Sequence, residues 1–175
     1  SQWLALDTEF IREKTYYSHF CLLQISNGSL AASVDPLAID DLSELVEIIY
    51  DESIVKIFHA GRQDLEIFHQ LWVRLPRPLF DTQLAATLLG LGSQVGYGNL
   101  VQKVTGRELE KGHSRTDWSR RPLSDEQLRY ALDDVIYLGD IYTDISARLQ
   151  DLGRETWLQD DFDELTDPAT YSMDP

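Results

Sequence analysis

The stretch Trp3-Leu4-Ala5-Leu6-Asp7-Thr8-Glu9-Phe10 decides the architecture that we expect for this chain. Its first four residues form an unbroken apolar run, which is typical of a strand buried on both faces of a sheet. Two carboxylates follow without a turn, and residues two apart in a strand point to the same face, so Asp7 and Glu9 project together. Like charges at the end of a buried strand repel each other and lose hydration. Two interpretations stay open: a divalent cation held between the carboxylates, or a strand whose acids simply reach solvent.

Length and cysteine content limit the class of protein. A chain of 175 residues suits one domain with a substantial core. The single cysteine, Cys21, excludes an intrachain disulfide and favours a reducing compartment. No apolar run approaches the ~18 residues of a membrane span, and no basic-then-apolar leader precedes the first strand. We therefore expect a cytoplasmic protein with no membrane partner.

The charge of the chain is strongly negative but unevenly distributed. The net charge of -15 argues against a general nucleic-acid binder, because phosphate binding normally requires an excess of Lys and Arg. Residues 103–129, however, hold seven Lys and Arg against five acids, a net charge of +2, so the remainder carries -17. A basic segment beside an acidic cluster is compatible with a polyanionic ligand. The charge therefore weakens a nucleic-acid hypothesis without excluding it.

Alternation, helical spacing and turn residues divide the rest of the chain into short strands and helices. The expected strands cover residues 3–10, 19–26, 29–34, 54–58 and 79–80, and the expected helices cover residues 40–50, 82–89, 99–105 and 125–149, with one more helix carrying Leu65, Phe68 and Leu71. Ser124 and Gln127 have the spacing of a capping box, and Asp81 is placed to cap a helix. We expect residues 1–157 to form the domain and residues 158–175 to leave it as an acidic, irregular tail. The order of elements predicts an α/β fold, a mixed β-sheet flanked by helices on both faces.

Asp64 is a further acid at a place where ligands often bind in α/β proteins. It follows a predicted strand and lies early in the next helix, at the edge of the sheet. Its other interpretation is a favourable charge in the first turn of a helix, worth a few tenths of a kcal/mol up to ~1 kcal/mol. Taken alone, the pattern favours this second role.

The predicted helix over residues 125–149 contributes Tyr130 and Asp134. At 100° per residue, Asp134 lies roughly 90° from the centre of the apolar stripe, and Asp133 lies roughly 170° away, in solvent. Tyr130 precedes Asp134 by one turn, so their side chains are neighbours. The spacing alone favours ordinary surface residues for both.

Three motifs of this chain resemble those of the DEDD 3′–5′ exonucleases. They are Asp7-Thr8-Glu9, the run from His59 to Phe68 that contains Asp64, and Tyr130 with Asp134 four residues on. The tyrosine is typical of the tyrosine branch of that family. Two more stretches, Phe80-Asp81-Thr82-Gln83-Leu84-Ala85-Ala86 and Asp117-Trp118-Ser119-Arg120-Arg121-Pro122-Leu123, are similar to ribonuclease D in particular. The similarity covers nearly the whole chain in the right order and implies a ribonuclease H-like fold.

The resemblance also implies a reaction and its residues. It implies a 3′–5′ exoribonuclease that trims RNA 3′ ends, such as those of tRNA precursors, by hydrolysis to nucleoside 5′-monophosphates. Asp7, Glu9, Asp64 and Asp134 match the family's ligands for two divalent cations, Mg²⁺ or Mn²⁺, and Tyr130 matches its catalytic tyrosine. We expect Tyr130 to orient the attacking water, because a reference pKa of ~10 disfavours full proton removal.

Substrate contacts are predicted for Thr8, Phe10, His59, Lys111 and Arg115. Phe10 is equally well explained by stacking on the terminal base or by core packing. A histidine that ends a strand, such as His59, is more often a structural hydrogen-bonding group. Lys111 and Arg115 are the cations that we expect on phosphates, although a solvated loop is the usual explanation for such a run.

Two alternatives remain at this level. One is a DNA 3′–5′ exonuclease of the same family, because recognition of the 2′-OH cannot be read from the sequence. The other is an inactive exonuclease fold that binds RNA, against which the five matched catalytic positions argue. Ribonuclease D carries C-terminal helical domains that help to hold RNA, and we expect those domains to lie outside this chain.

Overall fold

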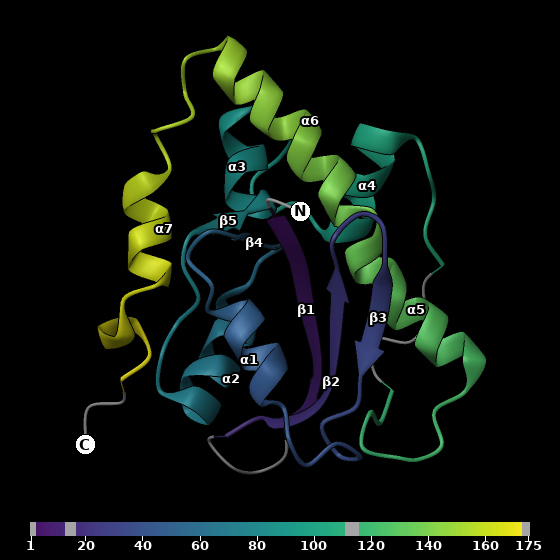
Figure 1. The fold of residues 1–175 in the computed structure, drawn as a ribbon. Helices are drawn as coiled ribbons and strands as arrows, with labels where there is room; N and C mark the ends of the chain where they lie inside the picture. The colour runs from purple at the N-terminus through teal and green to yellow at the C-terminus, as the bar shows by residue number, and fades with distance from the viewer. Residues whose placement is uncertain (1–2, 13–16, 111–115, 173–175) are drawn as a thin grey trace.

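The computed structural model describes residues 3–12, 17–110 and 116–172. Five strands form one mixed sheet in the order β3-β2-β1-β4-β5 (Figure 1). The strands are β1 Trp3–Ile11, β2 His19–Ser26, β3 Ala31–Val34, β4 Val55–Phe58 and β5 Leu79–Asp81. The central strand β1 pairs antiparallel with β2 and parallel with β4. The strand β1 is therefore the middle of the sheet, and it is covered on both faces, as its apolar run predicted.

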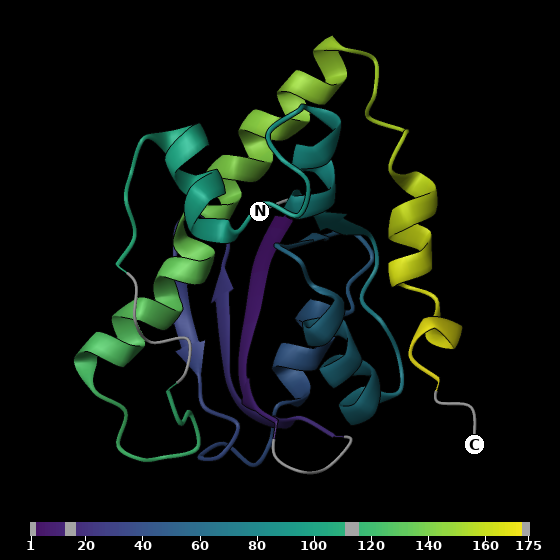
Figure 2. The ribbon, with the colours of Figure 1, turned by 180° about the vertical axis from the view of Figure 1, so that it is seen from behind.

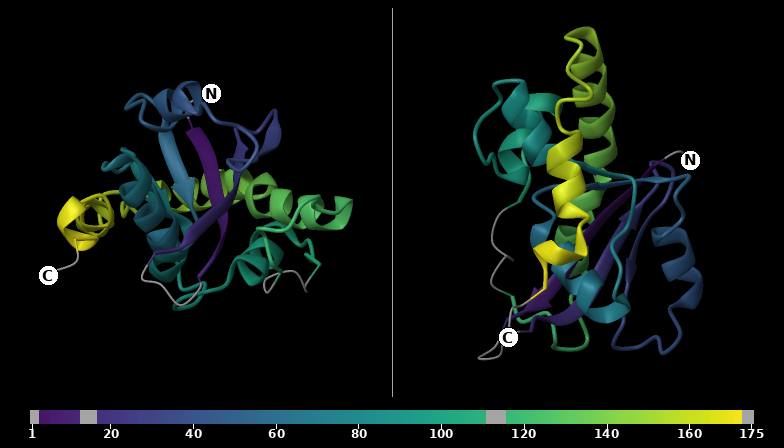
Figure 3. Two further views of the ribbon diagram at one scale, coloured as in Figure 1. Left: turned by 90° about the horizontal axis from the view of Figure 1, so that it is seen from below. Right: turned by 90° about the vertical axis from the view of Figure 1, so that its left-hand side faces the viewer.

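Helices cover both faces of this sheet, which confirms the predicted fold class. They are α1 Ser43–Ile49, α2 Arg62–Trp72, α3 Thr82–Leu88, α4 Tyr97–Thr105, α5 Asp125–Ile136, α6 Leu138–Asp151 and α7 Gln159–Leu165, followed by a 3-10 turn at Pro168–Thr170. Figures 2 and 3 show α5 and α6 following each other across the sheet, with α6 continuing beyond it. None of the helices in the described ranges has the length and apolar character that a membrane crossing requires.

The alternation of β1 assigns each of its side chains to one face. Leu4 and Leu6 are buried in the cluster that contains the apolar residues of α1 and α2. Ala5 is buried against Val135 of α5 and Leu138 of α6. Residues that follow Ala5 at spacings of two therefore face α5. The alternation therefore places the carboxylates of Asp7 and Glu9 on the face of the sheet that α5 covers.

Local capping signals that the sequence predicted are present. The side chain of Asp81 accepts hydrogen bonds from the backbone N–H groups of Gln83 and Leu84 at the start of α3. Ser124 and Gln127 form a reciprocal capping box at the start of α5. Both interactions satisfy N–H groups that have no partner inside the helix.

The prediction of one long helix over residues 125–149 is wrong in detail. The structure has two helices, α5 and α6, which meet at Tyr137. Val135 of α5 packs on the sheet, whereas Ile141 and Ile145 of α6 belong to a second cluster with α3 and α4. The change of packing partner coincides with the division of the helix, and Gly139, a weak helix former, lies two residues beyond Tyr137.

The prediction of an irregular tail from residue 158 is also wrong. Residues 159–165 form α7, and Leu158 and Phe162 are buried in the cluster that α6 shares with α3 and α4. The ring of Phe162 lies 5.4 Å from that of Phe80. The domain therefore continues past residue 157. Leu158, Phe162 and Leu165 have the spacing of a buried helical stripe, which the many acids around them obscured.

Candidate active site

The carboxylates of β1 meet an acid from α5. One oxygen each from Asp7, Glu9 and Asp134 lies within 4.8 Å of the others, and all three side chains are partly exposed. β1 supplies two of them on one face, as its period of two predicted, and α5 crosses that face with the third. Carboxylate oxygens are the ligands that Mg²⁺ and Mn²⁺ prefer. The cluster therefore fits a divalent cation.

Asp64 stands beside this cluster, held by the residue between the two β1 acids. It lies in the first turn of α2 and is 6% exposed. Its Oδ1 accepts a hydrogen bond from the backbone N–H of Thr8 at 3.1 Å and a second from the Thr8 hydroxyl. The negative charge of Asp64 helps to raise the pKa of Asp7, so the two carboxylates are close enough to interact.

Burial and mutual repulsion make these acids hard to ionise together. Burial, then repulsion by Asp64 and Asp134, raises the pKa of Asp7 well above its usual range. Burial, then repulsion by Asp134, raises the pKa of Glu9 to about 9. Burial raises the pKa of Asp64 to about 7 and that of Asp134 to about 6. A bound cation supplies the positive charge that full ionisation requires, which is the electrostatic pattern of a cation site.

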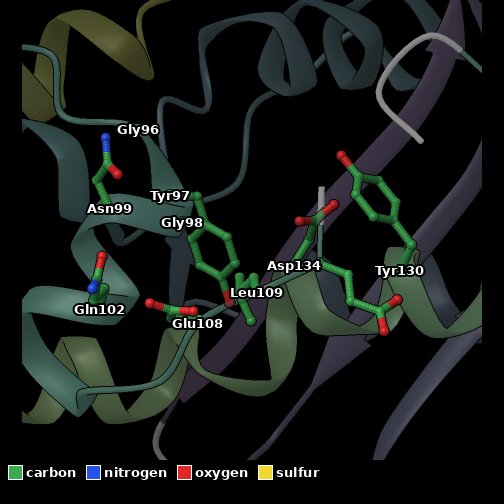
Figure 4. A pocket seen from close by; sticks show the side chains of 10 residues that line it. Gly96, Tyr97, Gly98, Asn99, Gln102, Glu108, Leu109, Tyr130 and Asp134 are labelled. Carbon is green, nitrogen blue, oxygen red and sulfur yellow. The ribbon is translucent and has the colours of Figure 1, made fainter. Parts of the chain in front are cut away.

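The side chain of Tyr130 projects from α5 and lies beside that of Asp134, as Figure 4 shows. Its ring stacks on Trp118 with ring centroids 6.2 Å apart and an angle of 23° between the planes. Trp118 is 1% exposed, so it offers Tyr130 a fixed surface. Burial, then the charge of Asp134, raises the pKa of Tyr130 to about 12. The phenol therefore keeps its proton at neutral pH and can donate a hydrogen bond.

A pocket of about 570 Å³ opens next to Tyr130 and Asp134. It is lined by Gly96, Tyr97, Gly98, Asn99, Gln102, Glu108, Leu109, Glu110, Tyr130 and Asp134. In Figure 4, Asn99 and Gln102 approach it from α4, on the side opposite Tyr130. The sequence analysis did not include these α4 residues. The signal in the sequence that could have indicated this pocket is the set of glycines Gly90, Gly92 and Gly96 before α4, because backbone without side chains leaves room for a ligand.

Tyr97 connects α4 to α5 and corrects one prediction. Its hydroxyl donates to the backbone carbonyl of Asp133 at 2.6 Å. Asp133 was expected in solvent, but it is partly buried, and this burial raises its pKa. The reason is that Tyr97 of α4 packs on this side of the helix and Glu110 lies near the carboxylate of Asp133. The helical wheel considered only the sheet as a packing partner.

Thr8 and His59 both make contacts inside the protein, and their contacts with substrate stay a prediction. Thr8 is 4% exposed and bonds Asp64. The Nδ1 of His59 lies 2.8 Å from the hydroxyl of Thr82, and its Nε2 lies 2.7 Å from the carbonyl of Val95. Burial lowers the pKa of His59, in agreement with a neutral ring. His59 therefore joins the end of β4 to the loop between α3 and α4, which contains Val95.

The other predicted substrate contacts have different outcomes. Phe10 is partly buried and packs against the core cluster of α1 and α2, which supports the packing interpretation. Lys111 and Arg115 lie outside the described residues. Of the ten residues predicted for the site, the structure thus groups the five of the catalytic motifs.

Comparisons with known proteins agree with this geometry. The sequence model of a family described as 3′–5′ exonuclease matches residues 1–150. Ribonuclease D of Sphingobium indicum is 46% identical over 177 residues, an alignment that covers 100% of this chain and 46% of the relative. Ribonuclease D of Zymomonas mobilis is also 46% identical and is covered to 45%. The chain therefore spans a little under half the length of these curated relatives.

Solved structures share the fold. Escherichia coli RNase D, described as an exoribonuclease involved in structured RNA processing, matches with a TM-score of 0.90 and 39% identity, over 99% of this chain and 46% of that chain. Brucella melitensis NrnC with bound Mg²⁺ matches with a TM-score of 0.83 and 28% identity, over 97% of this chain and 83% of that chain. The resemblance to ribonuclease D that the motifs indicated is confirmed. Because the family model matches most of the chain and the acidic motifs converge on one site, this chain belongs to the 3′–5′ exonuclease family.

Proposed function

We propose that this domain is a metal-dependent 3′–5′ exoribonuclease, which shortens RNA from its 3′ end by hydrolysis and releases nucleoside 5′-monophosphates. One observation carries the proposal: Asp7, Glu9 and Asp134 converge within 4.8 Å of one another, beside a pocket that also contains Tyr130. The preference for RNA 3′ ends, such as those of tRNA precursors, is supported by the similarity to proteins named ribonuclease D.

We assign the cations of this site to Asp7, Glu9, Asp64 and Asp134, and expect two Mg²⁺ or Mn²⁺ ions. When bound, such ions stabilise negative charge on a phosphate and acidify water. The chain contributes a rigid arrangement of ligands. Asp7 and Glu9 belong to the central strand, and Asp64 is held by both donors of Thr8.

Tyr130 supplies a positioned hydroxyl next to the ligands. Its raised pKa of about 12 favours a role in orienting the attacking water over a role as a base. The stacking on Trp118 restricts the ring, so the hydroxyl approaches the site from a defined direction. Holding a reactant in this way is itself a catalytic contribution.

The pocket between α4 and α5 is the place that we propose for the 3′-terminal nucleotide. Its volume of about 570 Å³ is in the range of sites for small ligands. The amide groups of Asn99 and Gln102 offer donors and acceptors to a base or a ribose, and both side chains are exposed. These contacts would position the terminal phosphodiester near Asp134.

The setting of this activity is part of the proposal. We propose a cytoplasmic location, which the free and buried thiol of Cys21 suits. Ribonuclease D relatives are about twice as long as this chain. We propose that further domains, corresponding to the rest of their length, help to hold RNA.

The direct test uses one RNA labelled at its 3′ end or at its 5′ end, incubated with and without Mn²⁺. We expect stepwise shortening of the 5′-labelled RNA, immediate release of labelled mononucleotide from the 3′-labelled RNA, and neither product in EDTA. A matched DNA strand distinguishes a DNA exonuclease, which would shorten DNA faster than RNA. Binding of RNA without shortening would replace the proposed enzyme by an RNA-binding module.

A further inference from the structure

Gln24 lies directly beneath the acidic cluster, although nothing in its sequence context marks it. It stands on β2, opposite Asp7 in the antiparallel register of β1 and β2. Paired residues of neighbouring strands share a face, so the side chain of Gln24 points to the same face as Asp7 and Glu9. It is 0% exposed. A buried amide in this position requires a physical explanation.

The amide of Gln24 bridges the two β1 acids. Its Nε2 donates to the Oε1 of Glu9 at 3.1 Å and approaches the Oδ2 of Asp7 at 3.4 Å. Its Oε1 is also buried and has no hydrogen-bond partner among the described residues. When both acids are ionised, as cation binding requires, turning the amide over would place its oxygen against two negative charges, so the orientation with the N–H groups toward the acids is the one that suits the cation-bound site.

This orientation leaves a buried oxygen unsatisfied, which opposes folding. An apolar side chain of the same size would avoid that cost, and a lysine would neutralise the acids permanently. Glutamine leaves its oxygen unsatisfied, but it does not neutralise the acids. It donates to two carboxylates without adding a charge, so a cation of higher charge can still bind there.

We propose that Gln24 is a positioning residue, which holds the carboxylates of Asp7 and Glu9 at the spacing that a divalent cation requires. The inference rests on the cation site of the proposed function. Gln24 acts through the ligands, as groups that orient metal ligands from behind commonly do. Glu9 depends on it most, because the contact with Glu9 is the shorter of the two.

The test measures Mn²⁺ binding to the metal-free 175-residue chain, without RNA, by isothermal titration and by the EPR signal of free Mn²⁺. Gln24→Met keeps the length and volume of the side chain and removes the donor. Gln24→Asn keeps the amide and shortens it by one methylene, so that it no longer reaches both acids. We expect the Kd for Mn²⁺ to rise about 10–100-fold in both variants, while circular dichroism shows a folded chain.

Ser33→Ala is the matched control. Ser33 pairs with Gln24 on the next strand, so the two lie in one row of the sheet, and its hydroxyl is buried without a partner among the described residues. We expect wild-type Mn²⁺ affinity in this variant. An equal loss of affinity in Ser33→Ala would show a general disturbance of the sheet and overturn the role of Gln24.

Two failures are distinguishable. If the wild-type chain does not bind Mn²⁺, the cation site of the proposed function is wrong. If the wild-type chain binds Mn²⁺ and either folded Gln24 variant binds it equally well, the cation site stands and the positioning role of Gln24 is overturned. Should Gln24→Met not fold, the Asn variant alone decides.

Discussion

Without divalent cations, the protein should lose stability as the pH rises from 5 to 8, because its acidic cluster resists ionisation. Burial, then repulsion by Asp134, raises the pKa of Glu9 from 4.5 to about 9. The folded chain therefore keeps a proton on Glu9 that the unfolded chain has already lost. Since the folded state binds more protons than the unfolded state over this range, the free energy of unfolding falls as the pH rises.

The size of the loss follows from the number of retained protons. One retained proton lowers the free energy of unfolding by about 1.4 kcal/mol per pH unit, or about 4 kcal/mol between pH 5 and pH 8. Glu9 is partly exposed, so solvent screening reduces the expected loss to about 2 kcal/mol. Asp64, whose pKa is raised to about 7, adds to the loss in the lower part of the range.

Two other groups act in the opposite direction and require a control. Burial lowers the pKa of His59 below 6.5 and that of Lys56 to about 8. Each raises the stability between its folded and its unfolded pKa, so the effect of His59 lies below about pH 6.5, inside this range, and that of Lys56 lies above about pH 8. A Glu9→Gln variant keeps both contributions. The difference between wild type and this variant therefore isolates the contribution of Glu9.

The assay is urea denaturation followed by circular dichroism at pH 5, 6.5 and 8, in EDTA and in excess Mn²⁺. In EDTA we expect the wild type to lose about 2 kcal/mol relative to Glu9→Gln across the range. In Mn²⁺ the trend should reverse, because cation binding requires the ionised carboxylates and stabilises the folded state. Parallel pH profiles of the two proteins in EDTA would refute the electrostatic reasoning.

Further substitutions separate the roles of the site residues. Asp7→Asn should abolish Mn²⁺ binding and RNA cleavage and slightly raise the melting temperature in EDTA, because it removes a buried acid whose raised pKa opposes folding at neutral pH; titration calorimetry that finds wild-type affinity contradicts this. Tyr130→Phe should keep wild-type Mn²⁺ affinity and lower the single-turnover cleavage rate by about 10²–10⁴-fold, with no recovery in excess Mn²⁺. Asp134→Asn should instead be partly rescued by excess Mn²⁺, and identical Mn²⁺ titrations of these two variants would refute the division of roles. Thr8→Val removes the hydroxyl donor to Asp64 and should weaken Mn²⁺ binding about 10-fold; unchanged Mn²⁺ affinity would show that the backbone N–H alone holds Asp64 in place.

The sequence by itself determined the features that depend on local periodicity. The period of two in β1 put Asp7 and Glu9 on one face, and the structure confirms that they meet. The helix starts at Asp81 and Ser124 could be predicted from the sequence, because a capping side chain bonds backbone groups only two or three residues away. The grouping of Asp64, Tyr130 and Asp134 with these acids came from the motifs and not from spacing. Spacing alone favoured a charge in the first turn of a helix for Asp64 and ordinary surface roles for Tyr130 and Asp134.

Tertiary structure decided which partner each polar group has. Thr8 and Asp64 are 56 positions apart, and His59 and Val95 are 36 positions apart, so no local pattern could show that these groups bond each other. The same limit explains Asp133, which α4 covers, and the division of the long helix at Tyr137. Gln24 is the clearest case, because its role depends on the register between two strands. A shift of that register by one residue would turn its amide to the other face of the sheet, away from the acids that it bridges.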